Sequence, residues 1–315
     1  MSKNIDINAI KALFFQSVRL KSHESCLILT DTEMIEVARP FYDYVKNIID
    51  DASFHIMQPT NKHGDEPEPE AAKLLKENDI SIMITKYSLS HTKARRNATE
   101  NGARIVSMPG ILIETINRCI DIDYDELHDT NMKLHETLYD SKKVKVTTDL
   151  GTDMEFKVRH VMGRNGGYRD KPGMWGNLPA GEIPSGIINA NGKLVIDGSF
   201  PGLGKLESPL TIEVKDNYAV KIEGERSDEV KKMLDSEGPN AYLLAEFGVG
   251  TNPKATITGS ILEDEKVLGT VHFALGNDIS YGGTNKVSIH VDGVIKEPNV
   301  FVDDKQIMKK GKLLI

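Results

Sequence analysis

Apolar residues in the first part of the chain gather in short continuous runs that are separated by amphipathic stretches. The runs are typical of strands buried on both faces, and they are CLILTD (26–31), SFHIMQ (53–58), ISIMIT (80–85) and ARIVSMPG (103–110). Helical spacing is found between them, at 33–48, 69–77 and 90–100. Strands that alternate with helices predict βαβ units and a parallel sheet.

The pattern changes after a long polar helix that we expect at 123–140. The stretch 143–160 indicates two strands around a turn, several short strands are expected in 192–223, and Gly and Pro become frequent. Helices are expected only near 227–236 and 259–268. The sequence therefore predicts two domains: an α/β, Rossmann-like domain with a parallel sheet over 1–142, and an α+β, β-rich domain over 143–315.

Composition and charge limit the classes of function. Of the 315 residues, 39% are hydrophobic and 27% are charged, which is typical of a globular protein with a substantial core. The formal net charge of −8 argues against a nucleic-acid partner, which a basic surface would bind. The chain has neither a GxGxxG segment nor a Walker A segment, so nothing indicates a nucleotide site.

Cellular location is predicted from apolar segments and cysteines. The apolar stretch at the N-terminus is too short for a signal peptide, and no later run approaches the roughly 18 apolar residues of a membrane helix. We expect a cytoplasmic protein without a membrane partner. Cys26 and Cys119 are far apart in apolar surroundings, which predicts two buried thiols rather than a metal or redox pair.

The stretch KVSIHVDGVI (286–295) alternates like a strand but places polar side chains on one face. Val287, Ile289 and Val291 share one face, whereas His290 and Asp292 lie on the other. Alternate strand residues are about 6.5–7 Å apart, so this imidazole and carboxylate can converge on one metal ion or on two neighbouring ions. The alternative is a hydrogen-bonded histidine beside a surface aspartate.

Three other stretches place ionisable groups in comparable surroundings. TVHFALG (270–276) carries His272, AYLLAEFGVGTNP (241–253) carries Glu246, and NLPAGEIPSG (177–186) carries Glu182 in what we expect to be a loop. Each group needs a hydrogen-bond partner, a salt bridge or a metal ion. Because four such stretches occur in one domain, a joint site is the better explanation, and the β-rich domain is predicted to bind metal.

The donor types restrict the metal and the chemistry. Two histidines with two or three carboxylates and no cysteine suit Zn²⁺, Co²⁺, Mn²⁺ or Fe²⁺. A carboxylate-rich set can bridge two metal ions about 3.5–4 Å apart, as in hydrolases, whereas two histidines and one carboxylate form the facial triad of oxygen-activating Fe²⁺ enzymes. A third alternative is a binding protein whose ions only hold the β-rich domain together.

NLPAGEIPSG, AEFGVGTNP, LGTVHFALG and the final HVD follow one another as in the M29 (thermophilic aminopeptidase) family, which the chain resembles over nearly all of 145–300. Residues 88–110 are similar to the N-terminal domain of that family. The resemblance implies a homodimer and a family tyrosine at Tyr281, and it draws attention to Glu265, one to two helical turns before the first histidine. The metal ligands that it implies are Glu182, Glu246, His272, His290 and Asp292.

The chain also resembles a related branch, the 2,5-dihydroxypyridine 5,6-dioxygenases. That resemblance implies a single Fe²⁺ held by His272, His290 and Asp292, with His91 in SLSHT as the base that deprotonates the substrate ring. The chain is shorter than a typical aminopeptidase, and the segment between the two histidines is brief.

Our leading expectation is a dinuclear metallo-aminopeptidase of the leucyl-aminopeptidase type, because both Glu182 and Glu246 are present. Two ions of Zn, Co or Mn would activate a shared water, with Glu246 as the bridge. Glu182 or Glu265 would carry a proton to the leaving amine, and Tyr281 would stabilise the oxyanion. The peptide would lie between the domains. The alternative is Fe(II)-dependent cleavage of a hydroxylated ring of a small-molecule substrate.

Overall fold

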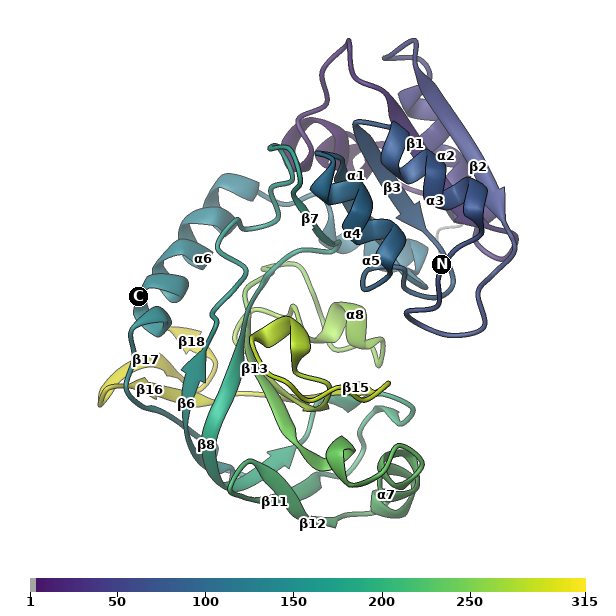
Figure 1. The fold of residues 1–315 in the computed structure, drawn as a ribbon. Helices are drawn as coiled ribbons and strands as arrows, with labels where there is room; N and C mark the ends of the chain where they lie inside the picture. Colours follow the sequence, from purple (N-terminus) through teal and green to yellow (C-terminus); the bar gives the residue numbers. More distant parts are fainter. Residues whose placement is uncertain (1–3) are drawn as a thin grey trace. The chain divides into compact units, whose positions relative to one another are not determined.

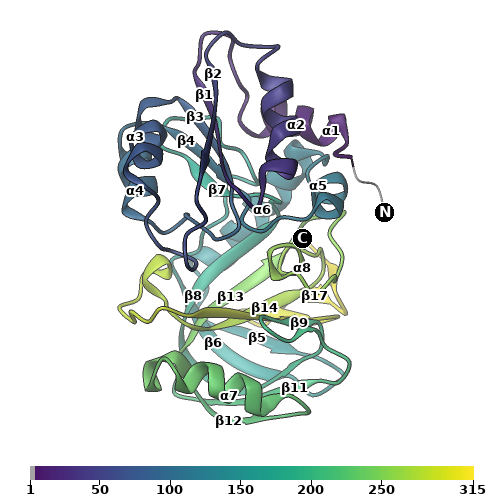
Figure 2. The ribbon, with the colours of Figure 1, turned by 90° about the vertical axis from the view of Figure 1, so that its right-hand side faces the viewer.

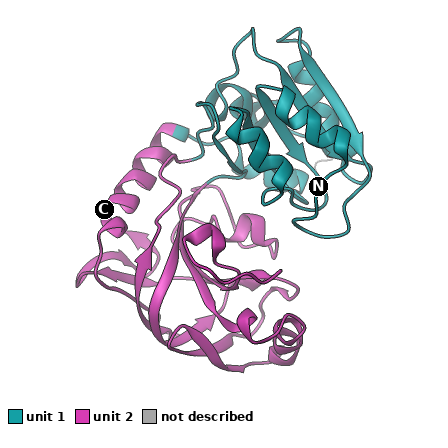
Figure 3. Ribbon diagram, in the orientation of Figure 1, with its two compact units in different colours: residues 1–124, 167–180 teal, residues 125–166, 181–315 magenta. Residues whose placement is uncertain are grey.

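The computed structural model describes residues 4–315 and divides into two compact units (Figure 3). Unit 1 runs up to Tyr124 and also includes Gly167–Ala180, whereas unit 2 consists of Asp125–Gly166 and Gly181–Ile315. The fold class is as expected: a parallel sheet with helices in one unit and a large antiparallel sheet in the other. The units depart from the ranges 1–142 and 143–315 because the long helix belongs to unit 2 and a short strand returns to unit 1.

Unit 1 is a five-stranded parallel sheet between two layers of helices (Figure 2). Its strands, in the order β2-β1-β3-β4-β7, are β2 (Ala52–Met57), β1 (Cys26–Asp31), β3 (Ile80–Ile84), β4 (Arg104–Ser107) and β7 (Trp175–Asn177). Its helices are α1 (Ile7–Lys11), the π-helix η1 (Ala12–Ser17), α2 (Ile35–Val45), α3 (Pro69–Glu77), α4 (Lys93–Glu100) and α5 (Ile113–Cys119). The sequence did not predict α1, η1, α5 or β7.

The continuous apolar runs of unit 1 form its central strands. Every residue of β1 and β3 is buried, since helices cover both faces of the sheet. On one face, α3 and α4 pack their alanines and leucines against β1, β3 and β4. The Thr92 side chain accepts a hydrogen bond from the Arg95 amide and thereby caps α4, which begins three residues later than the predicted stretch 90–100.

Unit 2 is built on a curled antiparallel sheet (Figure 1). Its main path, β15-β14-β13-β8-β6-β5-β16-β17-β18, consists of β15 (His290–Ile295), β14 (Val271–Gly276), β13 (Leu244–Gly250), β8 (Glu182–Ile196), β6 (Asp153–Arg159), β5 (Val144–Thr147), β16 (Asn299–Val302), β17 (Lys305–Lys309) and β18 (Lys312–Leu313). Off this path, β11 (Leu210–Lys215) pairs with β8 and with β12 (Tyr218–Glu223), and β9 (Ser199–Phe200) pairs with β10 (Gly204–Lys205). The helices are α6 (Tyr124–Tyr139), α7 (Ser227–Asp235), η2 (Pro239–Tyr242), α8 (Ile261–Asp264) and η3 (Ile279–Tyr281).

The core of unit 2 lies on one face of this sheet. Phe247 of β13 and Phe273 of β14 pack with Phe156 of β6, with ring centroids 4.9–5.5 Å apart. Val291 of β15 joins the same core, and α6 and α7 bury leucines in it. Because side chains alternate along each strand, the residues between these apolar positions project from the opposite face.

Three local predictions were wrong in unit 2. The helix expected at 259–268 is only the single turn α8, after which turns lead into β14. The strand expected at 286–295 begins at His290, where pairing with β14 starts. Glu182 lies in the first position of β8 rather than in a loop, since that segment pairs with β13.

The two cysteines are in the state that the sequence predicts. Cys26 and Cys119 are both buried thiols, as expected. Among the residues that the structure describes, no helix combines the length and the apolar composition needed to cross a bilayer.

Candidate metal centre

Strand register gathers the predicted donors on the face of the unit 2 sheet that is opposite the core. Glu246 of β13 and Asp292 of β15 both pair with Ala274 of β14, so they flank a small residue. His272 of β14 pairs with Gly248, and Glu182 of β8 pairs with Gly250. Small residues between the donors leave room for their side chains to converge above the strands.

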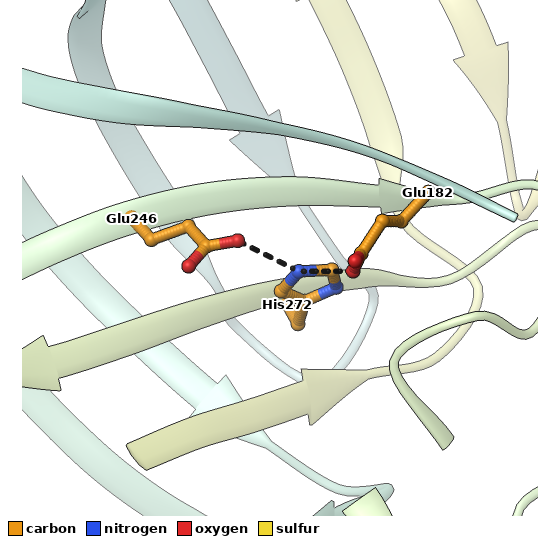
Figure 4. A group of neighbouring side chains, drawn as sticks. All are labelled: Glu182, Glu246 and His272. Atoms are coloured by element: carbon orange, nitrogen blue, oxygen red, sulfur yellow. Dashed lines mark hydrogen bonds and ion pairs between the residues drawn. The ribbon is translucent and has the colours of Figure 1, made fainter. Parts of the chain in front are cut away.

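The side chains converge through both imidazoles. Nε2 of His272 lies 3.3 Å from Oε1 of Glu246 and 3.6 Å from Oε2 of Glu182 (Figure 4). Nε2 of His290 lies 2.8 Å from Oε2 of Glu246 and 3.6 Å from Oδ1 of Asp292. The structure therefore brings together all five residues that the resemblance implied as ligands, with Glu246 between the two histidines.

The surroundings of His290 fix which nitrogen faces the cluster. Its Nδ1 lies 2.8 Å from the carbonyl oxygen of Asn277, to which an Nδ1–H group donates a hydrogen bond. This bond leaves Nε2 as the ligand atom, an arrangement that is common for metal-binding histidines. The Tyr281 ring stacks on the imidazole, with centroids 5.4 Å apart and planes at 21°.

The donor spacing fits a divalent metal ion. Within the described part of the chain, three overlapping groups have ligand atoms within 4.8 Å of one another: Glu182, Glu246 and His272; Glu246, His290 and Asp292; and Glu265, His272 and Asp292. Donors bound about 2.1 Å from one ion lie roughly 3.0–3.4 Å apart, which is close to the observed separations. Moreover, Oδ1 of Asp292 is buried with no hydrogen-bond donor, as expected where a cation completes the site.

Charge inside the cluster shifts the protonation of its members. Burial raises the pKa of Glu246, but hydrogen bonds from His272 and His290 outweigh burial and hold this pKa below its usual range. Burial lowers the pKa of His272, yet the hydrogen bond to Glu246 and its charge bring the net pKa to about 9. Burial likewise lowers the pKa of His290, but Asp292 and Glu246 together raise it well above its usual value, so without metal both rings favour the protonated form paired with Glu246, and a bound metal ion would replace these protons.

Sequence reasoning missed Lys266. This lysine follows α8, its side chain is 1% exposed, and its ammonium group pairs with Glu182 at 2.7 Å and with Glu265. Burial raises the pKa of Glu265 to about 8, although the charge of Lys266 opposes that shift. The only signal in the sequence is its position in LEDEK beside Glu265, and such charged runs are usually exposed.

The two other predicted catalytic residues lie in different units. Tyr281 belongs to η3 of unit 2. Burial is the main reason why its pKa is well above the usual range, and the charge of Glu246 and a hydrogen bond to it add to the shift. His91 belongs to unit 1. It is exposed just before α4, and its ring lies edge-on to that of Trp175, with centroids 5.9 Å apart. His91 is therefore not part of the cluster formed within unit 2.

Removing metal with a chelator is expected to loosen unit 2 and to leave unit 1 unchanged, since every donor of the cluster lies in unit 2. A ligand present at 100 times its Kd stabilises the folded state that binds it by about 2.7 kcal/mol. Hydrogen-exchange mass spectrometry should show lost protection in β13, β14 and β15 but not in β1 or β3. Equal loss in both units would contradict this expectation.

Comparisons with known proteins identify the family. A sequence model of the 2,5-dihydroxypyridine 5,6-dioxygenases matches residues 27–315. The 2,5-dihydroxypyridine 5,6-dioxygenase of Pseudomonas putida strain KT2440 is 25% identical over 254 residues, which cover 74% of this chain and 71% of the relative.

Two solved structures share the fold. The structure of 2,5-dihydroxypyridine dioxygenase from Pseudomonas putida KT2440 has a TM-score of 0.82 at 16% identity and covers 100% of this chain and 98% of its own. Wild-type AmpT from Thermus thermophilus, an M29 aminopeptidase, has a TM-score of 0.65 at 16% identity and covers 98% of each chain. These likenesses concern the fold.

The expectation of a dinuclear metallo-aminopeptidase is wrong, and the terms hydrolase, peptidase and metalloprotease do not apply, because the family match is to dioxygenases. The motifs misled because they bring together possible metal ligands on a fold that AmpT shares, and they do not specify the reaction. The oxyanion role of Tyr281 and the proton-carrying role of Glu182 or Glu265 belonged to peptide hydrolysis and are withdrawn. The branch held as the alternative is the supported one. The chain belongs to the 2,5-dihydroxypyridine 5,6-dioxygenase family.

Proposed function

We propose that this protein is an Fe(II)-dependent dioxygenase that opens the ring of a small dihydroxylated heterocycle, with 2,5-dihydroxypyridine as the first substrate to test. The observation that carries the proposal is the match of the dioxygenase family to residues 27–315. The donors support it, because two histidines and a carboxylate form the ligand set of oxygen-activating iron enzymes, and both histidines approach the shared carboxylate of Glu246.

His272, His290 and Asp292 are the residues that we propose to hold the iron. Fe(II) would supply the one-electron chemistry that lets O₂ react with a closed-shell ring, which protein side chains do not provide. The protein orients the ligands: the Asn277 carbonyl accepts a hydrogen bond from Nδ1 of His290, and the Tyr281 ring stacks on that imidazole. These contacts direct Nε2 toward the cluster.

A small-molecule substrate and a metal cofactor follow from the family. We further propose, from the resemblance described above, that His91 accepts a proton from a substrate hydroxyl group. Its exposed position gives solvent-borne molecules access to the imidazole. The homodimer and the cytoplasmic location that we expected remain predictions.

The test of this function is oxygen consumption. Protein loaded anaerobically with Fe(II) and mixed with aerated 2,5-dihydroxypyridine should consume one O₂ for each substrate lost, measured with an oxygen electrode and by ultraviolet absorbance. An aminoacyl anilide should stay intact under the same conditions. A folded, iron-loaded protein that consumes no oxygen with the pyridine would contradict the proposal.

His91→Ala is expected to lower turnover by at least about 100-fold, since a positioned general base contributes roughly 10²–10⁴-fold. The bound iron should be retained, because His91 lies in unit 1 and the donors lie in unit 2. His23→Ala, which changes another exposed histidine of unit 1, is the matched control and should have wild-type turnover. If both variants turned over at the wild-type rate, His91 would not be the base.

A further inference from the structure

Lys266 is a buried cation inside the donor cluster. Its backbone is fixed on both sides, because its amide donates to the Glu263 carbonyl at 2.9 Å and its carbonyl accepts from the Asn252 amide at 2.8 Å. Its side chain is 1% exposed and ends between the carboxylates of Glu182 and Glu265. A lysine is rarely buried to this extent, and its charge is tolerated only where it is paired.

The ammonium group of Lys266 contacts two of the three donor groups and leaves the third without this neighbouring cation. Glu182 and Glu265 each belong to only one of the three donor groups, and these are the two groups without His290. Lys266 contacts both carboxylates, so each of these two groups already has a positive charge at one of its members. The group formed by Glu246, His290 and Asp292 includes neither carboxylate.

Charge balance then favours a single metal ion. The cluster contains four carboxylates: Glu182, Glu246, Glu265 and Asp292. A dication bound at Glu182 or Glu265 would stand beside the ammonium group, and the two cations would repel strongly in a buried site. The group of Glu246, His290 and Asp292 contains neither of the carboxylates that the ammonium group contacts, so this group remains available to one ion.

We propose that Lys266 takes the place of a second metal ion, so that the cluster binds one divalent ion at His290 and Asp292, two of the three residues proposed above to hold the iron. The inference rests on the proposed function only in taking the resident group to be a divalent metal. Glu182, which pairs with the ammonium group, is then a positioning residue rather than a ligand. The number of metal ions per chain is thereby determined by the lysine as well as by the number of ligands.

The test counts Mn(II), which binds oxygen and nitrogen donors and has a distinctive electron paramagnetic resonance spectrum. After equilibrium dialysis at pH 8, the wild-type protein should hold one Mn(II) per chain and show the six-line spectrum of an isolated ion. Lys266→Met keeps the length of the side chain and removes its charge, so it should bind a second Mn(II) and show the spectrum of a coupled pair. Lys254→Met, at an exposed lysine on the preceding loop, should behave as the wild type.

A second variant keeps the test decisive if Lys266→Met does not fold, as judged by circular dichroism. Glu182→Gln should still bind one Mn(II), with an affinity weakened by about 10–100-fold, as is typical for changes to outer partners. Two ions in the wild type, one ion in folded Lys266→Met at saturating Mn(II), or loss of the ion in Glu182→Gln would each overturn the inference. None of these counts uses O₂ or a pyridine, so an enzyme that binds one ion but lacks ring cleavage would refute only the proposed function.

Discussion

Asp292→Asn is expected to remove the bound metal and to abolish turnover while the fold persists. Asp292 belongs to two of the three donor groups, and its Oδ1 is buried without a hydrogen-bond donor. The amide keeps the volume of the side chain but loses the charge that a divalent ion requires. Metal affinity should fall by more than about 100-fold, beyond the effect of changing an outer partner. Elemental analysis after gel filtration measures the loss.

The matched control for this variant is Asp197→Asn. The Asp197 side chain is 11% exposed, as is that of Asp292, and it accepts a hydrogen bond from the Lys296 amide directly after β15. It belongs to none of the donor groups found in the described residues. The control should lose some stability and keep its metal. Full metal content in Asp292→Asn would show that the ion is held elsewhere.

The fold class could be predicted because local patterns determine most of it. The apolar runs 26–31 and 80–85 became the fully buried strands β1 and β3, and the helical stretch 69–77 coincides with α3. The boundary between the units could not be predicted from local patterns, because it depends on pairing between distant segments. Gly167–Ala180 belongs to unit 1 because β7, only three residues long, pairs with β4 some seventy positions earlier in the chain. So short a strand carries no detectable periodicity.

The candidate site was predictable in its donors but not in its organisation. Alternation along 286–295 placed His290 and Asp292 on one face, and β15 retains that alternation. The alignment of Asp292 with Glu246 across Ala274 depends on the register of three strands, which no single segment contains. Lys266 was missed because its burial follows from tertiary packing, whereas its local sequence is typical of an exposed turn.

Gly248→Ala is expected to weaken metal binding, because the added methyl group would displace the His272 ring. The His272 ring lies directly over Gly248, and a Cβ at this position would be 2.0 Å from Nε2 of His272. Because His272 is completely buried, the ring cannot move away without displacing its neighbours. We expect a loss of about 1–3 kcal/mol in the free energy of unfolding, as in other overpacked sites, and a metal affinity lowered by about 100-fold.

Gly293→Ala separates these two effects, since it makes the same change on the opposite face of the same sheet. A Cβ there would be 2.3 Å from Cδ1 of Ile196, the flexible end of a core side chain, so repacking is easier. This variant should lose some stability but bind metal with wild-type affinity, measured by calorimetric titration with Mn(II). Gly248→Ala should differ by a displaced His272 and a weakened ion. Equal metal affinities in the two variants would mean that Nε2 of His272 is not a ligand, and the proposed triad would have to exclude it.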